Sequence, residues 1–130
     1  MADTTSSIKG AELFIEEQPS PMLVKHPDGV VEEMWYLDSL LHRMDGPAVI
    51  RYNPDGKIVS NTWYVRGELH RDDGPAYLSS TVEEWYQHNK RHRTHGPARI
   101  DKQYGGKVVS RTWFTDGRMM ARENGSDLAI

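Results

Sequence analysis

The sequence predicts an all-β fold, an elongated antiparallel meander of stacked β-hairpin repeats. Three observations predict it: a seven-residue phrase occurs three times, a Trp-aromatic pair precedes each copy at a fixed distance, and turn residues separate short runs of strand-forming residues. Self-similarity at a period of about 20–50 residues is the signature of a repeat architecture. A residue that occurs once in every repeat is therefore first interpreted as part of the repeat.

The repeated phrase is His-Arg-x-x-Gly-Pro-Ala, at residues 42–48, 70–76 and 92–98. From Trp to the Gly of the phrase, each of the first three units spans 11 residues. From the Pro of the phrase to the next Trp, the distances are 16, 10 and 16 residues. Side chains of a strand alternate between faces with period two, so even changes in length preserve the register. This variable half is therefore interpreted as a β-hairpin, short in one unit and long in two.

Turn chemistry supports the hairpins. Residues 53–56, Asn-Pro-Asp-Gly, have Pro and Gly where a type I turn followed by a left-handed residue requires them, and residues 26–29 and 103–106 repeat the pattern. The fourth residue after each Trp is of a type that tolerates positive φ, which predicts a second turn in each unit: Ser39, Gly67, Asn89 and Gly117. The result is a meander of about eight or nine short strands.

Composition limits the function. The chain of 130 residues lacks cysteine and any apolar run long enough to span a membrane, and its N-terminus has no signal-peptide pattern. The absence of thiols fits a reducing cytoplasm. The net charge is −3, divided into −5 for residues 1–33 and +2 for residues 34–130. A nearly neutral repeat body argues against strong nucleic-acid binding.

The predicted organisation has three parts. Residues 1–19 form an N-terminal tail or a short capping segment, residues 20–125 form a repeat domain of about four units, and residues 126–130 form a frayed C-terminus. The apolar residues Leu13 to Ile15 either cover the open end of the sheet or dock on a partner. Two open strand edges favour a homodimer.

The repeated His, Arg and Asp residues are interpreted as structural. In a stacked sheet, His42, His70 and His92 would lie about 10 Å apart, too far to share one metal ion. We expect each imidazole to pack beside a Trp or to bond a turn carbonyl. The carboxylates before Gly-Pro are expected to fix the turn and to pair with the Arg, although His95 takes that place in the third copy. The sequence thus predicts no catalytic residue, no metal site and no cofactor, and the chain is not expected to be an enzyme.

Adjacent strand residues point to opposite faces, so each unit has its Trp on one face and its Tyr or Phe on the other. Ala48 and Ile50 predict an apolar face, whereas Val49 and Arg51 are expected to face solvent. Removing the side chain of a central Trp is expected to cost about 3–5 kcal/mol. The Tyr and Phe row is either half-buried by cross-strand pairing or an exposed binding surface.

A partner-binding site is predicted on that second row, next to a basic turn at residues 88–95. It consists of Tyr64, Tyr86, Lys90, Arg91 and Arg93. If Tyr64 and Tyr86 are instead covered, the binding face lies on the opposite side of the sheet or at Leu13 to Ile15. A second hypothesis is that the basic turn binds phosphate or anionic lipid.

The pattern Trp-Tyr-x-x-Gly-x-x-His-Arg-x-Asp-Gly-Pro-Ala, at residues 63–76, resembles the variant MORN-like repeats found in proteins of large bacteriophages and giant viruses. Ser39 and Asn89 depart from the pattern at the turn glycine. The resemblance implies stacked antiparallel hairpins and protein–protein interaction rather than catalysis. By analogy, it implies a small phage accessory protein that binds and inhibits a host (defence) protein.

Overall fold

The computed structural model describes residues 18–125. The expectations for Leu13 to Ile15 and for residues 126–130 lie outside this range. The described part contains fourteen β-strands: β1 (Ser20–Lys25), β2 (Val31–Leu37), β3 (Leu40–Leu41), β4 (Val49–Tyr52), β5 (Ile58–Thr62), β6 (Tyr64–Val65), β7 (Glu68–Leu69), β8 (Tyr77–Ser79), β9 (Val82–Glu84), β10 (Tyr86–Gln87), β11 (Lys90–Arg91), β12 (Arg99–Lys102), β13 (Val108–Thr115) and β14 (Arg118–Asn124).

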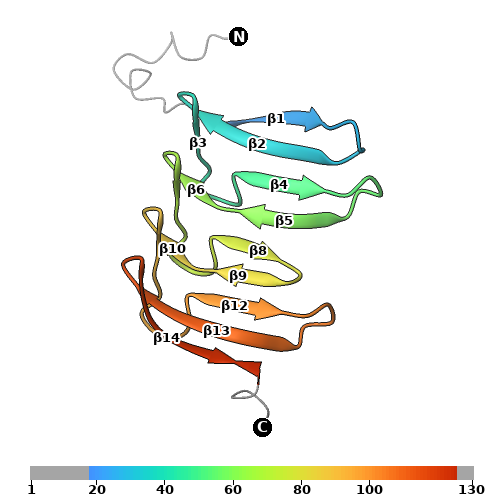
Figure 1. The fold of residues 1–130 in the computed structure, drawn as a ribbon. Coiled ribbons are helices and arrows are strands. Elements are labelled where there is room, and N and C mark those ends of the chain that lie inside the picture. Colours follow the sequence, from blue (N-terminus) through green and yellow to red (C-terminus); the bar gives the residue numbers. More distant parts are fainter. Residues whose placement is uncertain (1–17, 126–130) are drawn as a thin grey trace, which may run out of the picture.

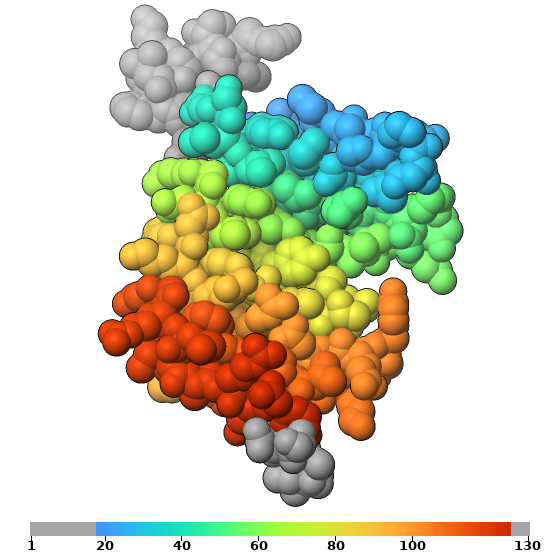
Figure 2. Space-filling model, in the orientation of Figure 1, coloured from blue at the N-terminus to red at the C-terminus, as the bar shows by residue number. Residues whose placement is uncertain are grey.

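The predicted all-β meander is confirmed. The main sheet is antiparallel, and its strands follow the chain in the order β1-β2-β4-β5-β8-β9-β12-β13-β14. Successive hairpins stack from the N-terminal to the C-terminal end (Figure 1), and in the space-filling view each part of the chain borders its sequence neighbours (Figure 2). Within residues 18–125, no helix is long and apolar enough to cross a membrane.

Each unit also contains a short hairpin that the sequence had indicated only as a turn. In the central units these hairpins are β6-β7 and β10-β11. In the first unit, β3 pairs with the end of β2, and in the last unit the end of β13 pairs with the start of β14. The short hairpins form a second row beside the main sheet (Figure 1). Neighbouring short hairpins are joined through backbone bonds: the amides of Gly67, Asn89 and Gly117 donate to Leu41, Leu69 and Arg91 of the preceding unit, over 2.8–2.9 Å.

Both sets of predicted turns are confirmed, except that the 103–106 turn is not of type I, because its third residue, Gly105, has a φ of 95°. In the short hairpins, the two central residues of each turn have positive φ, for example Arg66 at 49° and Gly67 at 81°. Positive φ at both positions defines the type I′ turn, whose twist matches that of a two-stranded ribbon. In the long hairpins, Gly56 has a φ of 88°, and its amide donates to the Asn53 carbonyl over 2.8 Å. The 26–29 and 103–106 turns make the equivalent bond.

The core along the Trp face is built from small residues. Ala48, Ala76 and Ala98 have no exposed surface, and the four Trp rings are half-buried. Each of these Ala carbonyls accepts a bond from the amide of a Trp, as Ala76 does from Trp63 over 2.6 Å. A larger side chain at the Ala positions would separate the loop from the sheet that it covers.

The opposite face is only partly open to solvent: Arg51 is exposed, as expected, but Val49 is half-buried. Ser60, Ser110 and Thr112 on that face are only 3–5% exposed. Long polar side chains from neighbouring strands and short hairpins lie across this face. One example is Arg99, which binds Asp101 over 2.8 Å, while Asp101 accepts a bond from Ser110 over 2.9 Å. The second face is therefore a polar, partly covered layer held by hydrogen bonds.

Candidate partner-binding site

The repeated histidines join one unit to the next. The Nδ1 atoms of His42, His70 and His92 accept the backbone N–H of the first turn residue in the following short hairpin, over 2.9, 3.2 and 3.0 Å. The expected structural role is right, but the partner is an amide rather than a turn carbonyl. An Nδ1 atom that accepts a bond carries no proton, so the geometry requires the tautomer protonated at Nε2.

His42 is the most sharply testable of these residues because it is only 8% exposed. Replacing His42 with Ala leaves the Arg66 N–H without its acceptor, which is expected to cost about 1–3 kcal/mol of unfolding free energy. His42→Asn is the matched control, since the Asn oxygen can occupy nearly the same place as Nδ1. Chemical denaturation should show partial recovery in the Asn variant; equal losses in both variants would show that the bond contributes nothing.

Each repeated Arg stacks on the Trp eight residues earlier. The guanidinium carbons of Arg43, Arg71 and Arg93 lie 3.9, 3.8 and 3.9 Å from the ring centroids of Trp35, Trp63 and Trp85. In each unit, Nη1 also donates to the carbonyl of the Pro in the same loop, over 3.1–3.2 Å. The loop is thus closed over the Trp by its own Arg, and cation–π attraction adds to the packing.

The Gly of each phrase leaves room for this stack. A Cβ atom at Gly46, Gly74 or Gly96 would lie 2.8–3.0 Å from the guanidinium carbon of the Arg in its loop. At these distances the Arg side chain has to shift before a Cβ can be accommodated. The phrase His-Arg-x-x-Gly-Pro-Ala therefore corresponds to one loop. Its His accepts a hydrogen bond from the next unit, its Arg stacks on the Trp, its Gly leaves space for the Arg, and its Ala is buried in the core.

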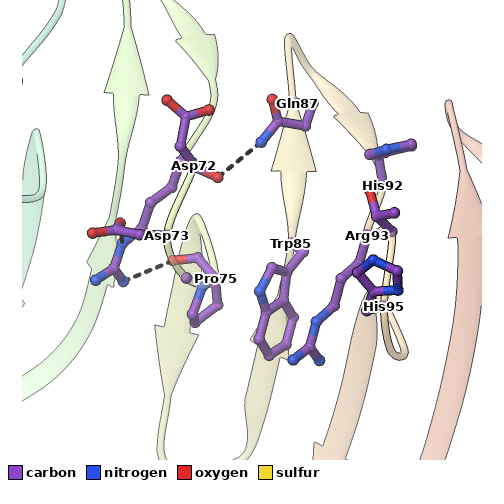
Figure 3. A pocket seen from close by; sticks show the side chains of 11 residues that line it. Asp72, Asp73, Pro75, Trp85, Gln87, His92, Arg93 and His95 are labelled. Atoms are coloured by element: carbon purple, nitrogen blue, oxygen red, sulfur yellow. Dashed lines mark hydrogen bonds and ion pairs between the residues drawn. The ribbon is translucent and has the colours of Figure 1, made fainter.

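The covered Trp residues lie in clefts that separate successive loops. One cleft of about 670 Å³ lies between residues 71–75 and 92–95, with Trp85 and Gln87 lining it. Figure 3 shows the Trp85 ring between Pro75 of one loop and Arg93 of the next, with His95 beside Arg93. A second cleft of about 740 Å³ repeats this arrangement around Trp63, between the first and second loops. The repeats therefore present a series of similar clefts on the Trp face.

The aromatic side chains of the predicted site do not form a freely exposed row. Tyr64 and Tyr86 are both half-buried. Burial raises the pKa of Tyr86, and the nearby carboxylate of Glu84 raises that pKa further. The guanidinium of Arg91 lies between Tyr86 and Phe114, 5.7 and 5.3 Å from the two ring centroids. Tyr86 is therefore packed against Arg91 within the fold.

The predicted cations separate into different environments. Arg91 donates to the Glu84 carboxylate over 2.7 Å, and Glu84 is only 9% exposed. Arg93 belongs to the Trp face, where it stacks on Trp85, whereas Lys90 is exposed in the short hairpin. Of the five predicted residues, the structure therefore brings Arg91 to Tyr86 and places only Arg93 at a cleft. Gln87, Thr94 and His95 also line that cleft, and the constant interval of eight residues from Trp to Arg was the sequence signal for it.

Asp101 gives the second face a pH dependence. A hydrogen bond from Arg99 holds the pKa of Asp101 below its ordinary value of 3.8, despite partial burial. Because the pKa is lower in the folded state, ionised Asp101 stabilises the fold above about pH 4, and this contribution is lost as the pH falls through the folded-state pKa. Asp101→Asn should therefore unfold more easily than the parent at pH 7, with the difference narrowing towards pH 2. A constant difference across that range would contradict this prediction.

Residues 18–125 contain no group of three His, Cys, Asp or Glu side chains arranged to hold a metal ion. In comparisons with known proteins, no family model, no curated protein and no solved structure matches this chain.

Proposed function

We propose that this chain is a non-enzymatic protein-binding module whose contact surface is the series of clefts on the Trp face. The observation that carries the proposal is the division of roles within each loop. His, Arg, Gly and Ala hold the loop in place, while the pair of residues between Arg and Gly changes from copy to copy, although Asp occupies its second position in the first two. These pairs line the clefts: Met44-Asp45, Asp72-Asp73 and Thr94-His95. Constant scaffolds with variable rims are typical of repeat proteins that bind other proteins.

The MORN-like pattern extends this proposal. It supports a small viral accessory protein, acting in the host cytoplasm, that binds a host defence protein and blocks it. Clefts with acidic, basic and aromatic lining residues fit a protein partner, because mixed polar rims around aromatic side chains are common in protein interfaces.

The test is capture from bacterial lysate on the immobilised chain, followed by calorimetry with the purified captured protein. Thr94→Tyr adds uncharged bulk at the mouth of the cleft, at an exposed position. Gln103→Tyr adds the same bulk in a distant exposed turn. The proposal requires that Thr94→Tyr weakens binding while Gln103→Tyr does not. Equal binding by both variants would move the interface away from this cleft.

Binding of phosphate or anionic lipid by the basic turn is the less favoured alternative. Such binding needs several cations directed to one surface, but Arg91 is paired with Glu84 and Arg93 is turned towards Trp85. Lys90 alone does not supply that surface.

We also propose a homodimer formed through the outer strands of the sheet. Apolar side chains are exposed on both: Met22 and Leu23 on β1 are 54% and 69% exposed, and Met119 and Met120 on β14 are 60% and 62% exposed. Pairing of outer strands would satisfy backbone groups and cover these side chains. Light scattering at increasing concentration should approach twice the monomer mass of 14.9 kDa. A constant monomer mass would contradict the dimer.

A further inference from the structure

The third loop differs from the first two in one electrostatic feature. In the first loop, Arg43 Nε donates to Asp45 over 3.0 Å, and in the second, Arg71 Nε donates to Asp73 over 3.2 Å. The corresponding residue of the third loop is His95. Within residues 18–125, no carboxylate pairs with Arg93, although its guanidinium makes the same Trp stack and the same Pro carbonyl bond as the other two.

The position of the Arg93 guanidinium is fixed before any ligand arrives. Trp85 supports one face at 3.9 Å, Gly96 closes the other, and Nη1 is engaged by the Pro97 carbonyl over 3.1 Å. The Nε side of the guanidinium remains for an acceptor, and the first two loops show that a carboxylate fits there. A fixed Arg loses little conformational freedom on binding, and charge-assisted bonds to carboxylates are among the stronger hydrogen bonds.

The surroundings define what the ligand must be. Residues 92–95 form one wall of the 670 Å³ cleft, and residues 71–75, which include Arg71, Asp72 and Asp73, form the other. The carboxylate side chains of that second wall are 84% and 88% exposed. Asp72 is bonded to His70 and Asp73 to Arg71, but their exposed oxygens still disfavour a phosphate dianion or an anionic membrane and favour a cation placed beside the carboxylate.

We propose that this cleft binds an acidic side chain of a partner polypeptide, whose carboxylate takes at Arg93 the place that Asp45 and Asp73 hold in the other loops. A basic residue next to it in the partner faces Asp72 and Asp73. This assignment rests on the proposed protein-binding function and specifies the chemistry of one cleft. In the first two loops the carboxylate bound to the Arg comes from the same loop, whereas in the third loop the partner supplies it.

The assignment can be tested with short peptides and NMR. The probes are acetyl-Lys-Asp-Gly amide and acetyl-Lys-Asn-Gly amide, which differ only in the carboxylate. In titrations at constant ionic strength, the Asp peptide should shift the Trp85 indole and Arg93 Nε signals in a saturable manner, and the Asn peptide should not. Inorganic phosphate is the competing probe, and saturation of the same signals at a lower concentration of phosphate would overturn the assignment to a peptide carboxylate.

Two substitutions transfer the distinguishing residue between the second and third loops. His95→Asp supplies the missing internal carboxylate, so affinity for the Asp peptide should fall by about tenfold or more while the melting temperature holds or rises. Asp73→His empties the position on Arg71, so a second saturable site should appear at Trp63. His95→Asn is the control that adds no charge and should bind as the parent does. Unchanged binding by His95→Asp, or no new site in Asp73→His, would overturn the assignment.

The two proposals fail in distinguishable ways. If the peptides do not bind but Thr94→Tyr still abolishes capture of a protein, the cleft is an interface and only its carboxylate chemistry is wrong. If the peptides bind as expected but no protein is captured, the carboxylate site stands and the proposed cellular function falls.

Discussion

Trp85→Ala is expected to lower the unfolding free energy by about 3 kcal/mol, the lower end of the range for large core aromatics. The ring is half-buried rather than fully enclosed, which reduces the loss from transfer to water. However, the Arg93 guanidinium loses the Trp85 ring, on which it stacks at 3.9 Å, and the loop that Arg93 closes loses the surface that it packs on. Since small domains are stable by only about 5–15 kcal/mol, this is a large share of the total.

Circular dichroism during chemical denaturation is the suitable measurement, because the substitution itself changes Trp fluorescence. Trp113→Ala is the matched control: no Arg guanidinium within residues 18–125 stacks on that ring. The Trp113 variant should lose less. A Trp85→Ala protein that melts within a few degrees of the parent would show that the Trp face is a surface and not a core.

Gly96→Ala should be similarly damaging, at about 2–5 kcal/mol, because two costs coincide. The backbone at Gly96 has a φ of 135°, which L-residues rarely adopt, and the added Cβ would lie 2.8 Å from the guanidinium carbon of Arg93. The guanidinium would have to shift from its place between Gly96 and Trp85, so the side chain proposed to hold the partner's carboxylate would be displaced. Both stability and peptide binding should therefore fall together.

Two other glycines separate these costs. Gly56 has a φ of 88° with nothing within 4 Å of an added Cβ, so Gly56→Ala reports backbone strain alone, about 1–2 kcal/mol. Gly46 lacks the positive φ, but its Cβ would lie 3.0 Å from Arg43, so Gly46→Ala reports the contact alone. If Gly96→Ala is no worse than Gly56→Ala in denaturation experiments, the contact with Arg93 is not a constraint.

The sequence predicted the parts of the fold that follow from local chemistry. The positive φ at Ser39, Gly67 and Asn89, the turns ending at Gly56 and Gly106, and the opposite placement of Trp and Tyr all follow from residue type and strand periodicity. The two-residue strands were missed because β6 and β7 gain most of their support from the neighbouring short hairpins, which no local pattern describes.

The contents of the candidate site depended on contacts between units. That His42 accepts an amide 24 residues away, or that Arg91 turns to Glu84, could not be derived without the stacking geometry. The Arg–Trp stack was more accessible, since its eight-residue interval is constant in three units. The prediction placed Arg91 and Arg93 in one site. In the structure they extend to opposite faces, although only His92 separates them in the sequence.

The joints between units have a consequence for how such a chain can vary. Every central unit receives the same bonds from its predecessor that it gives to its successor, through its His, its loop amide and its short-hairpin turn. A whole unit could therefore be duplicated or deleted without leaving one of these donors or acceptors unpaired where the neighbouring units meet. Each duplication would add one cleft with its own pair of residues on the rim, so the binding surface could be extended and changed one cleft at a time while the scaffold remained constant.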